Sequence, residues 1–212
     1  MLRKILRITG YLVLLLVLAF VGLLSYSTLT DYRPEPESEE EVAIEGQAEL
    51  KNLPDTLSLL IWNIGYCGLG AEMDFFNDGG KTVRASEEQS ARYLNAVATF
   101  IGTMKDCADV VMIQEVDRNS KRSYNTDQIP VISKQLPGFA SSFALNYDVK
   151  FVPVPFSFPY TPYGKTYGGL VSFSHLPATR ATRVQYPGGF DWPTRLYMLD
   201  RCALELRYPL KD

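Results

Sequence analysis

The sequence predicts an α+β fold in which a mixed β-sheet is flanked by helices, with a separate apolar helix in front of it. Residues 57–63 (LSLLIWN) and 109–115 (DVVMIQE) are nearly continuous apolar runs, which are typical of interior strands buried on both faces. Apolar residues repeat at helical spacing between them, within residues 86–105. A charge-free run at residues 8–24 is close to the length of a membrane span.

The N-terminal run is predicted to be a transmembrane signal anchor over residues 8–25. Arg3, Lys4 and Arg7 precede the run and an acidic segment follows it, so the positive-inside rule places residues 1–7 in the cytoplasm. The rest of this single-pass chain is then expected outside the cytoplasm. A cleaved signal peptide and a buried core helix are the alternatives, although the run is long for a signal peptide and its cleavage site is poor.

Residues 26–54 are predicted to form an acidic extended linker. Residues 31–49 contain eight acidic residues and one arginine, with too little apolar content to fold alone. We interpret the segment as a spacer, with a cation-attracting tail as the alternative. From residue 51 onward, 17 Lys or Arg balance 16 Asp or Glu, which argues against a large surface for duplex nucleic acid and leaves small phosphate esters open.

The strand–helix–strand order of the next segment predicts a crossover unit. Ser86 and Gln89 form a capping-box pattern where the helix begins. Because the helix carries the chain back across the sheet, both strands should end on the same edge, where ligands bind in such folds. We therefore expect Asn63 and Glu115, which end the two strands, to lie close together. The long loop at residues 65–85 is expected to frame this site.

The rest of the chain is predicted to be mainly strands. A short helix is expected at residues 128–135. Strands are expected at residues 139–145, 150–154, 169–173, 179–186 and 196–207. Prolines between the second and third of these strands prevent regular pairing, so that stretch is expected to be a loop rich in Phe and Tyr.

Three motifs in this order resemble the endonuclease/exonuclease/phosphatase superfamily of Mg²⁺-dependent phosphoesterases. They are Trp62-Asn63-Ile64-Gly65, then Ile113-Gln114-Glu115-Val116, and a Gly-rich strand at residues 167–177 (YGGLVSFSHLP). The resemblance extends from residue 57 to about residue 206. It implies that residues 55–212 form a mixed β-sandwich flanked by helices.

The chain departs from the family pattern in its last part. The family's Thr-His pair, its Gly-Asp-Phe-Asn-like turn and its Ser-Asp-His triplet, which supplies the general base, are absent from the sequence. The single histidine, His175, falls where the family carries any basic residue. We therefore expect a partial, C-terminally incomplete domain of little or no activity, either a truncated hydrolase or an incomplete gene product.

The resemblance assigns roles to Glu115 and Asn63, and side-chain chemistry adds Arg118 and Tyr167 as candidates. Glu115 is expected to be catalytic and to bind Mg²⁺ or Mn²⁺, because one well-placed carboxylate completed by water and substrate can hold such an ion. Asn63 is expected to be a second catalytic and metal-site residue that holds the phosphate or the attacking water. Arg118 is a candidate substrate-binding residue through charge-assisted hydrogen bonds. Tyr167 is a candidate for stacking on a base or touching a lipid headgroup.

Other polar and aromatic residues are weaker candidates, because loops use Asp and Asn for backbone reasons and basic loop residues are usually solvated. They are Asp78, Asp117, Asn146, Asp148, Lys121, Arg122, Tyr160, Tyr163 and Lys165. His175, before a Leu-Pro strand end, is not expected to be a general base. Cys67, Cys107 and Cys202 are too scattered for a disulfide framework or a zinc site and are expected to be buried and free, with one disulfide in an oxidising compartment as the alternative.

Two functions are consistent with these observations. The first is a membrane-anchored, metal-dependent phosphoester hydrolase of the phosphodiesterase, nuclease or phosphatase type. The second is a non-catalytic, membrane-tethered binding or assembly module. The near-neutral charge and the location outside the cytoplasm favour a lipid headgroup, a nucleotide or another small phosphate ester over chromosomal DNA. The oligomeric state stays open.

Overall fold

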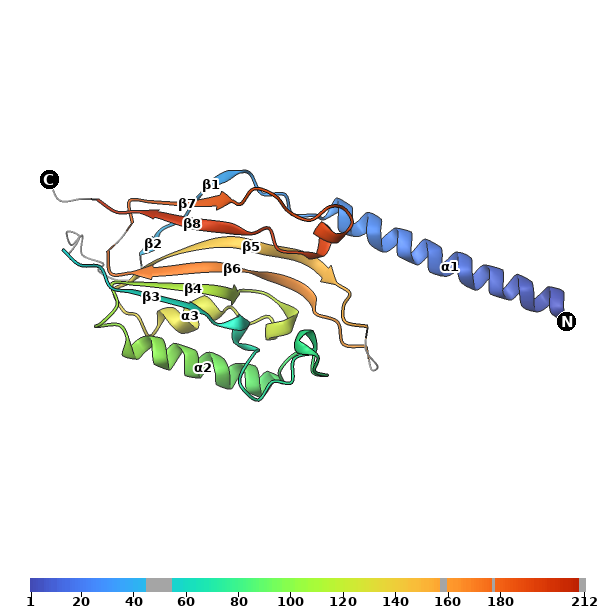
Figure 1. The fold of residues 1–212 in the computed structure, drawn as a ribbon, viewed down its shortest axis with the longest axis horizontal. Coiled ribbons are helices and arrows are strands. Elements are labelled where there is room, and N and C mark those ends of the chain that lie inside the picture. Colours follow the sequence, from blue (N-terminus) through green and yellow to red (C-terminus); the bar gives the residue numbers. More distant parts are fainter. Residues whose placement is uncertain (45–54, 157–159, 177, 210–212) are drawn as a thin grey trace.

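A computed structural model describes residues 1–44, 55–156, 160–176 and 178–209. These residues form a mixed α+β fold with two sheets and an N-terminal apolar helix, as the sequence predicts. Figure 1 shows the layers: a three-stranded sheet, then a five-stranded sheet, then helices on the far side of the five-stranded sheet. The strand orders are β1-β7-β8 and β2-β5-β6-β4-β3.

The predicted crossover unit is confirmed. It consists of β3 (Leu59–Asn63), α2 (Glu87–Thr103) and β4 (Val110–Asp117), and the two strands pair in parallel. Ser86 caps α2 through the expected capping box with Gln89, which satisfies two backbone N–H groups at the helix start. Both strands therefore end on the same edge of the five-stranded sheet.

The main core lies between α2, α3 (Gln128–Ser133) and the helix-side face of the five-stranded sheet. Ile101 of α2 packs with Val111 and Ile113 of β4, and all three side chains are buried. The opposite face of the sheet is open at its edge strand, since Leu59 and Ile61 are 52% and 62% exposed. The two faces of one strand therefore have opposite environments.

The next two strands are longer than predicted. β5 (Ala140–Val152) is one bulged strand where two strands, at 139–145 and 150–154, were expected. Bulges after Leu145 and Val149 absorb the polar residues in between while the strand stays paired with β6 (Gly164–Ser174). β6 also begins earlier than predicted, so part of the expected aromatic loop belongs to the sheet.

The predicted acidic linker is wrong in part, because two of its segments pair with the sheets. β1 (Glu37–Glu40) pairs with β7 (Arg180–Gln185), and β2 (Ala43–Ile44) pairs with β5. The acidic composition does not prevent this pairing, because the strand lies at a sheet edge and Glu37 and Glu39 point into solvent. Charged residues on an edge strand also oppose pairing with further chains.

Two further differences concern the ends of the chain. β8 (Cys202–Arg207) is shorter than the predicted strand at 196–207, because a 3₁₀ helix, η4 (Thr194–Tyr197), occupies its start. The N-terminal helix α1 (Leu2–Leu29) extends past the predicted span at both ends. Its most apolar window has a mean hydropathy of 2.5 and no buried residues, so α1 is long and apolar enough to cross a membrane.

Three further 3₁₀ helices lie in the connections of the domain. They are η1 (Gly65–Cys67), η2 (Phe76–Asp78) and η3 (Lys121–Ser123).

Candidate functional site

The two strand-end residues meet, as expected from the crossover unit. Asn63 and Gln114 are register partners on β3 and β4, and the Asn63 Nδ2 atom donates to Glu115 Oε1 over 2.9 Å. The contact joins positions 52 residues apart in sequence. It lies at the carboxyl edge of the parallel pair, where side chains from different strands can act together.

Glu115 occupies a bulge that takes its side chain out of the regular strand pattern. The register between β4 and β6 shifts between Ile113 and Val116, and Glu115 has a φ of 57°. A left-handed backbone at a residue with a side chain costs on the order of 1–3 kcal/mol and persists only where the surroundings enforce it. The bulge leaves Ile113 and Val116 buried on either side while Glu115 reaches the edge of the sheet.

Asn63 orients Glu115 through both ends of its amide. Its Oδ1 atom accepts a hydrogen bond from the Gly65 backbone N–H at 2.9 Å, so its Nδ2 atom faces the carboxylate. The amide oxygen, which would be the metal-binding atom, is thus engaged by the backbone. The structure gives Asn63 a positioning role, and Glu115 is the residue with a free oxygen: its Oε2 atom has no hydrogen-bond partner within the described ranges.

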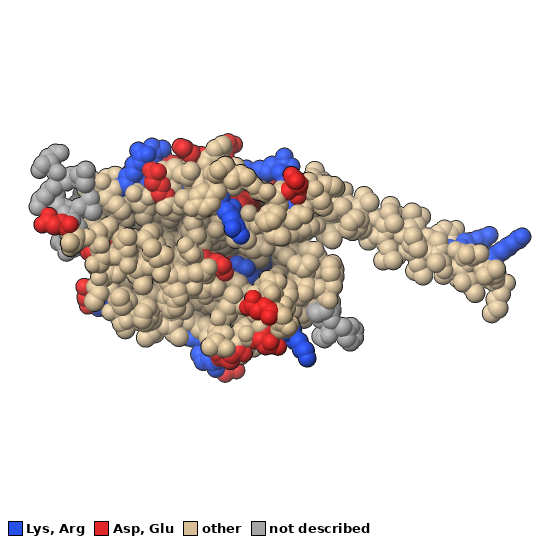
Figure 2. Space-filling view, in the orientation of Figure 1, with Lys and Arg blue, Asp and Glu red and all other residues tan. Residues whose placement is uncertain are grey.

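A cleft of about 650 Å³ opens beside Glu115. Its walls are mainly aromatic and apolar, with contributions from Tyr66, Phe75, Phe76, Tyr147, Tyr163, Pro193, Tyr197, Met198 and Leu199. Figure 2 shows this face hollowed between the layers, with acidic and basic atoms inside the hollow. Glu115 and Asn63 also line a second hollow of about 750 Å³ between the two sheets, beside the exposed face of β3.

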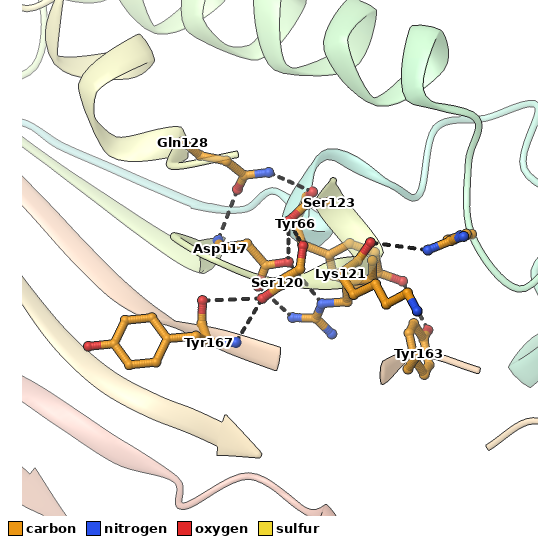
Figure 3. A network of polar contacts seen from close by, with 10 residues as sticks. Tyr66, Asp117, Ser120, Lys121, Ser123, Gln128, Tyr163 and Tyr167 are labelled. Atoms are coloured by element: carbon orange, nitrogen blue, oxygen red, sulfur yellow. Dashed lines mark hydrogen bonds and ion pairs between the residues drawn. The ribbon is translucent and has the colours of Figure 1, made fainter. Parts of the chain in front are cut away.

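A buried polar cluster lies under the cleft (Figure 3). Asp117, whose side chain is fully buried, accepts two hydrogen bonds from the Arg122 guanidinium, both 3.0 Å long. Ser123 Oγ donates to the same carboxylate at 2.9 Å. Gln128 links the cluster to η1, because it accepts from the Asp117 N–H and donates to the Tyr66 carbonyl. Both carboxylate oxygens of Asp117 thus have partners, and so do the Nε and Nη2 atoms of Arg122, as buried charges require.

Arg122 connects this cluster to the cleft. Its guanidinium lies 3.8 Å from the centre of the Tyr66 ring, whose hydroxyl is 3.1 Å from the Tyr163 hydroxyl. Burial lowers the pKa of Arg122, but the charge and hydrogen bonds of Asp117 outweigh it and raise the pKa overall, so the guanidinium stays charged. Burial raises the pKa values of Tyr66 and Tyr163, so both hydroxyls keep their protons near neutral pH.

The two residues predicted to bind substrate lie elsewhere. Arg118 donates twice to Asp127 Oδ2, at 3.0 and 3.1 Å, and its guanidinium lies over the Phe143 ring. Tyr167 exchanges backbone hydrogen bonds with the Ser120 hydroxyl, and its ring points away from the buried cluster (Figure 3). Neither residue lines the cleft beside Glu115.

The weaker candidates are mostly structural. Asp148 pairs with Lys150, Asp78 is exposed on η2, and the Asn146 carbonyl accepts from the Asp200 N–H. Lys121 accepts a hydrogen bond from Arg84 through its carbonyl, Lys165 lies in β6, and the Tyr160 hydroxyl donates to the Pro153 carbonyl. His175 bonds the Lys105 carbonyl through Nε2 and lies against Phe139, which agrees with its predicted exclusion as a base.

The cysteines are free, but one of them is not buried as expected. Cys67 and Cys202 are buried, and burial raises the pKa of the Cys67 thiol to about 12. Cys107 is exposed because it follows the C-terminal end of α2 in a turn at the surface.

Tyr66, Tyr147 and Phe76 line the cleft although they are not among the residues predicted from the sequence. Tyr66 had a usable signal, since it comes three residues after Asn63, at the start of the loop expected to frame the site. Tyr147 had none, because only the long bulged course of β5 brings it over Arg122. Asp117 and Arg122 are separate loop candidates in the sequence, and the structure joins them in one ion pair.

Glu115 carries the only carboxylate among the described residues that line the cleft. Within the described residues there is no group of three or more His, Cys, Asp or Glu side chains placed to hold a metal ion. Any cation at this place could take one carboxylate oxygen, from Glu115, and would need water or a ligand for its other positions. Comparisons of the chain with protein-family models, with curated proteins and with solved structures find no match.

Proposed function

We propose that this chain is the cation- and phosphate-binding part of a membrane-anchored phosphoester hydrolase of the endonuclease/exonuclease/phosphatase type. The contact between Asn63 and Glu115, at the lip of a cleft with a buried arginine beneath it, carries the proposal. The two facing sheets, with helices on one side, would be part of that family's sandwich. We further propose that α1 spans the membrane with Arg3, Lys4 and Arg7 in the cytoplasm.

Each residue of the site has a proposed role. Glu115 would hold Mg²⁺ or Mn²⁺, which when bound polarises a phosphoryl oxygen and stabilises the leaving oxygen. Asn63 fixes the orientation of the Glu115 carboxylate. Arg122 supplies a permanent positive charge beneath the cleft. Of the hydrogen-bonded pair Tyr66 and Tyr163, one hydroxyl donates to the other, and the second hydroxyl proton is available to a phosphate oxygen.

A proton acceptor for the attacking water is missing from this set. The only histidine, His175, is engaged by the Lys105 carbonyl and does not line the cleft. We therefore propose that the chain on its own binds a cation and a phosphate ester and turns the ester over negligibly. This observation also favours the second candidate, a non-catalytic membrane-tethered binding module that uses the same cleft.

Cation binding can be tested with the full chain in detergent by titrating Mn²⁺ and recording its paramagnetic resonance signal. Glu115→Gln keeps the size of the side chain and removes its charge, so Mn²⁺ affinity should fall by about a hundredfold. Asp78→Asn, at an exposed carboxylate on η2, is the matched control and should leave affinity unchanged. Equal Mn²⁺ affinity in the Glu115→Gln variant and the unmodified chain would contradict the proposal.

Turnover separates the two candidate functions. A Mg²⁺-dependent phosphodiesterase activity of this chain that Glu115→Ala abolishes would show that the base is supplied after all, and would overturn the assignment of negligible turnover. Binding of inorganic phosphate that is independent of Mn²⁺ and insensitive to Glu115→Gln would favour the binding module.

The topology can be tested on the native cysteines. Cys107 is exposed whereas Cys67 and Cys202 are buried, so a membrane-impermeant maleimide should react at Cys107 alone. On intact cells it should label the unmodified chain and not a Cys107→Ser variant. Labelling that appears only after the membrane is permeabilised would place the domain in the cytoplasm.

A further inference from the structure

The last turns of α1 are bonded to the domain. Ser27 Oγ lies 3.3 Å from the Tyr197 hydroxyl, and the Trp192 Nε1 atom donates to Thr28 Oγ1 at 3.2 Å. Just beyond the helix, Asp31 accepts from Arg195 at 2.7 Å. These contacts set the distance between the end of the apolar helix and the folded domain.

That distance matches the headgroup layer of a bilayer. The strongly apolar part of α1 ends at Leu24, and Thr28 lies four residues further on, which is about 6 Å along a helix. The headgroup layer on each side of the hydrocarbon is about 5–7 Å thick. Trp192, bonded to Thr28, therefore lies at headgroup depth when α1 spans the bilayer. Tryptophan is enriched at that depth, because its ring is apolar and its N–H is polar.

The segment that contacts α1 also forms a wall of the cleft. Pro193, Thr194 and Tyr197 line the cleft, and Tyr197 reaches Ser27. The wall of the cleft also includes Val154, two residues after the end of β5. Figure 1 shows the end of β5 and the start of β6 at the same end of the domain as the junction with α1. The cleft therefore lies at the end of the domain that carries the membrane helix.

Exposed apolar side chains lie in the segment after β5 and in the segment before η4. Phe156 is 81% exposed, Trp192 56% and Val154 41%. Phe156 also stacks on Tyr160, whose ring is half exposed. A surface of this kind is unfavourable in water and favourable against a lipid interface.

The cleft itself has the polarity of an amphiphile. Most residues of its walls are aromatic or aliphatic, and its two charged residues, among those that the structure describes, are Arg122 and Glu115. A volume of about 650 Å³ is in the range of small-molecule sites and accommodates a phosphate headgroup with the first part of an acyl chain. A nucleotide has no aliphatic chain that could pack against the apolar wall at Met198 and Leu199.

We infer that the ligand of the cleft is a membrane phospholipid, which enters sideways from the leaflet next to the domain. The acyl chain lies along the aromatic wall and the phosphate reaches Arg122 and the cation at Glu115. Trp192 and Phe156 rest in the headgroup layer and hold the cleft at the height of the lipid phosphates. This inference rests on the proposed function for the phosphate end of the site, and on the junction with α1 for the apolar end.

The depth of Trp192 is the first test. The chain has two tryptophans, so Trp62→Phe leaves Trp192 as the only one, and Trp192→Phe leaves Trp62, which packs against Phe100 of α2. Each variant of the full chain is placed in phosphatidylcholine vesicles that carry a spin label on the headgroup or near the acyl end. The headgroup label should quench Trp192 about twofold more than the deep label and should leave Trp62 unquenched. Equal, negligible quenching of Trp192 by both labels would overturn the inference.

The occupant of the cleft is the second test. Phe76→Trp, in a chain that also carries Trp62→Phe and Trp192→Phe, places a single reporter in the cleft wall. Vesicles of phosphatidylcholine with brominated acyl chains should quench it about threefold more than vesicles whose bromine is on diacylglycerol, which lacks the phosphate. Soluble glycerol phosphate should not reverse the quenching. Reversal would identify a soluble ester as the ligand, and equal quenching by both lipids would show no recognition of phosphate; either result would overturn the inference.

The two proposals fail in different ways. Mn²⁺ binding that depends on Glu115, measured without lipid, tests the proposed function. Trp192 depth and Phe76→Trp quenching need no metal and test the lipid inference. A chain that binds Mn²⁺ at Glu115 but whose Trp192 is not quenched would keep the proposed function and lose the phospholipid.

Discussion

Asp117 and Glu115 lie two residues apart on β4 and occupy opposite environments. Asp117 is fully buried, holds Arg122 in a two-bond ion pair and accepts a third hydrogen bond from Ser123. Glu115 stands at a strained bulge beside a cleft, with one oxygen held by Asn63. The first carboxylate is saturated by the protein, whereas the second keeps an oxygen for a ligand. The capacity of a carboxylate to bind a ligand therefore depends on how many of its oxygens the protein already engages, and not on its position in the sequence.

The largest expected effect comes from breaking the saturated pair. Asp117→Ala leaves the Arg122 charge buried without its partner, so the free energy of unfolding should fall by about 3–5 kcal/mol. Urea denaturation of the full chain in detergent measures it. The control is Glu205→Ala, which breaks the pair with Arg207; because these side chains are 46% and 63% exposed, the loss should be below about 1 kcal/mol. Similar losses in both variants would show that the buried pair contributes no more to the free energy of unfolding than the exposed pair.

The next effect is on the orientation of Glu115. Asn63→Ala removes the amide that holds the carboxylate, so Mn²⁺ affinity should fall by about tenfold, less than in Glu115→Gln, because the ligand itself remains. Titration monitored by paramagnetic resonance checks it, with Asn119→Ala, at an exposed asparagine, as the control. An unchanged affinity would remove Asn63 from the site.

A smaller effect on stability should distinguish the backbone strain at Glu115 from the proposed role of its side chain in Mn²⁺ binding. Its φ of 57° lies in the region that glycine adopts freely, so Glu115→Gly should raise the free energy of unfolding by about 0.5–1 kcal/mol while abolishing Mn²⁺ binding. Glu115→Gln keeps the strained side chain and serves as the control, with stability near that of the unmodified chain. A loss of stability in Glu115→Gly would mean that the bulge is not strained.

The last effect is a pH dependence at a third carboxylate, Asp200. Burial, and then the negative charge of Asp31, raise the pKa of Asp200 from 3.8 to about 6. The folded state thus holds this proton more tightly than the unfolded state, so the contribution of Asp200 to stability decreases as pH rises from about 4 to about 6.

Asp200→Asn should therefore unfold at a higher temperature than the unmodified chain above pH 6, and the difference should vanish near pH 4. Melting curves at both pH values measure the difference, with Asp106→Asn, at an exposed aspartate, as the control. A difference that grows toward low pH would reverse the assigned sign.

Local patterns predicted those parts of the fold whose contacts are close in sequence or imposed by topology. The capping box at Ser86, the amphipathic helix and the parallel strands followed from residue spacing, and the meeting of Asn63 with Glu115 followed from the handed crossover between them. The substrate-binding assignments of Arg118 and Tyr167 came from a polar loop and an aromatic stretch. The structure engages Arg118 with Asp127, because nothing in the loop after β4 fixes the direction of its side chains. Tyr167 lies in β6, and the pairing of β6 with β5 turns its ring away from the buried cluster.

The sequence by itself determined an apolar N-terminal helix, a crossover unit and two polar strand ends on one sheet edge, because periodicity and chain direction are properties of short segments. Only the tertiary structure decided that an acidic segment pairs as an edge strand, that Arg122 is locked under the cleft by Asp117, and that the cleft lies at the junction with α1. These features depend on contacts between distant residues, whose free energies are set by burial and by the partners available in three dimensions.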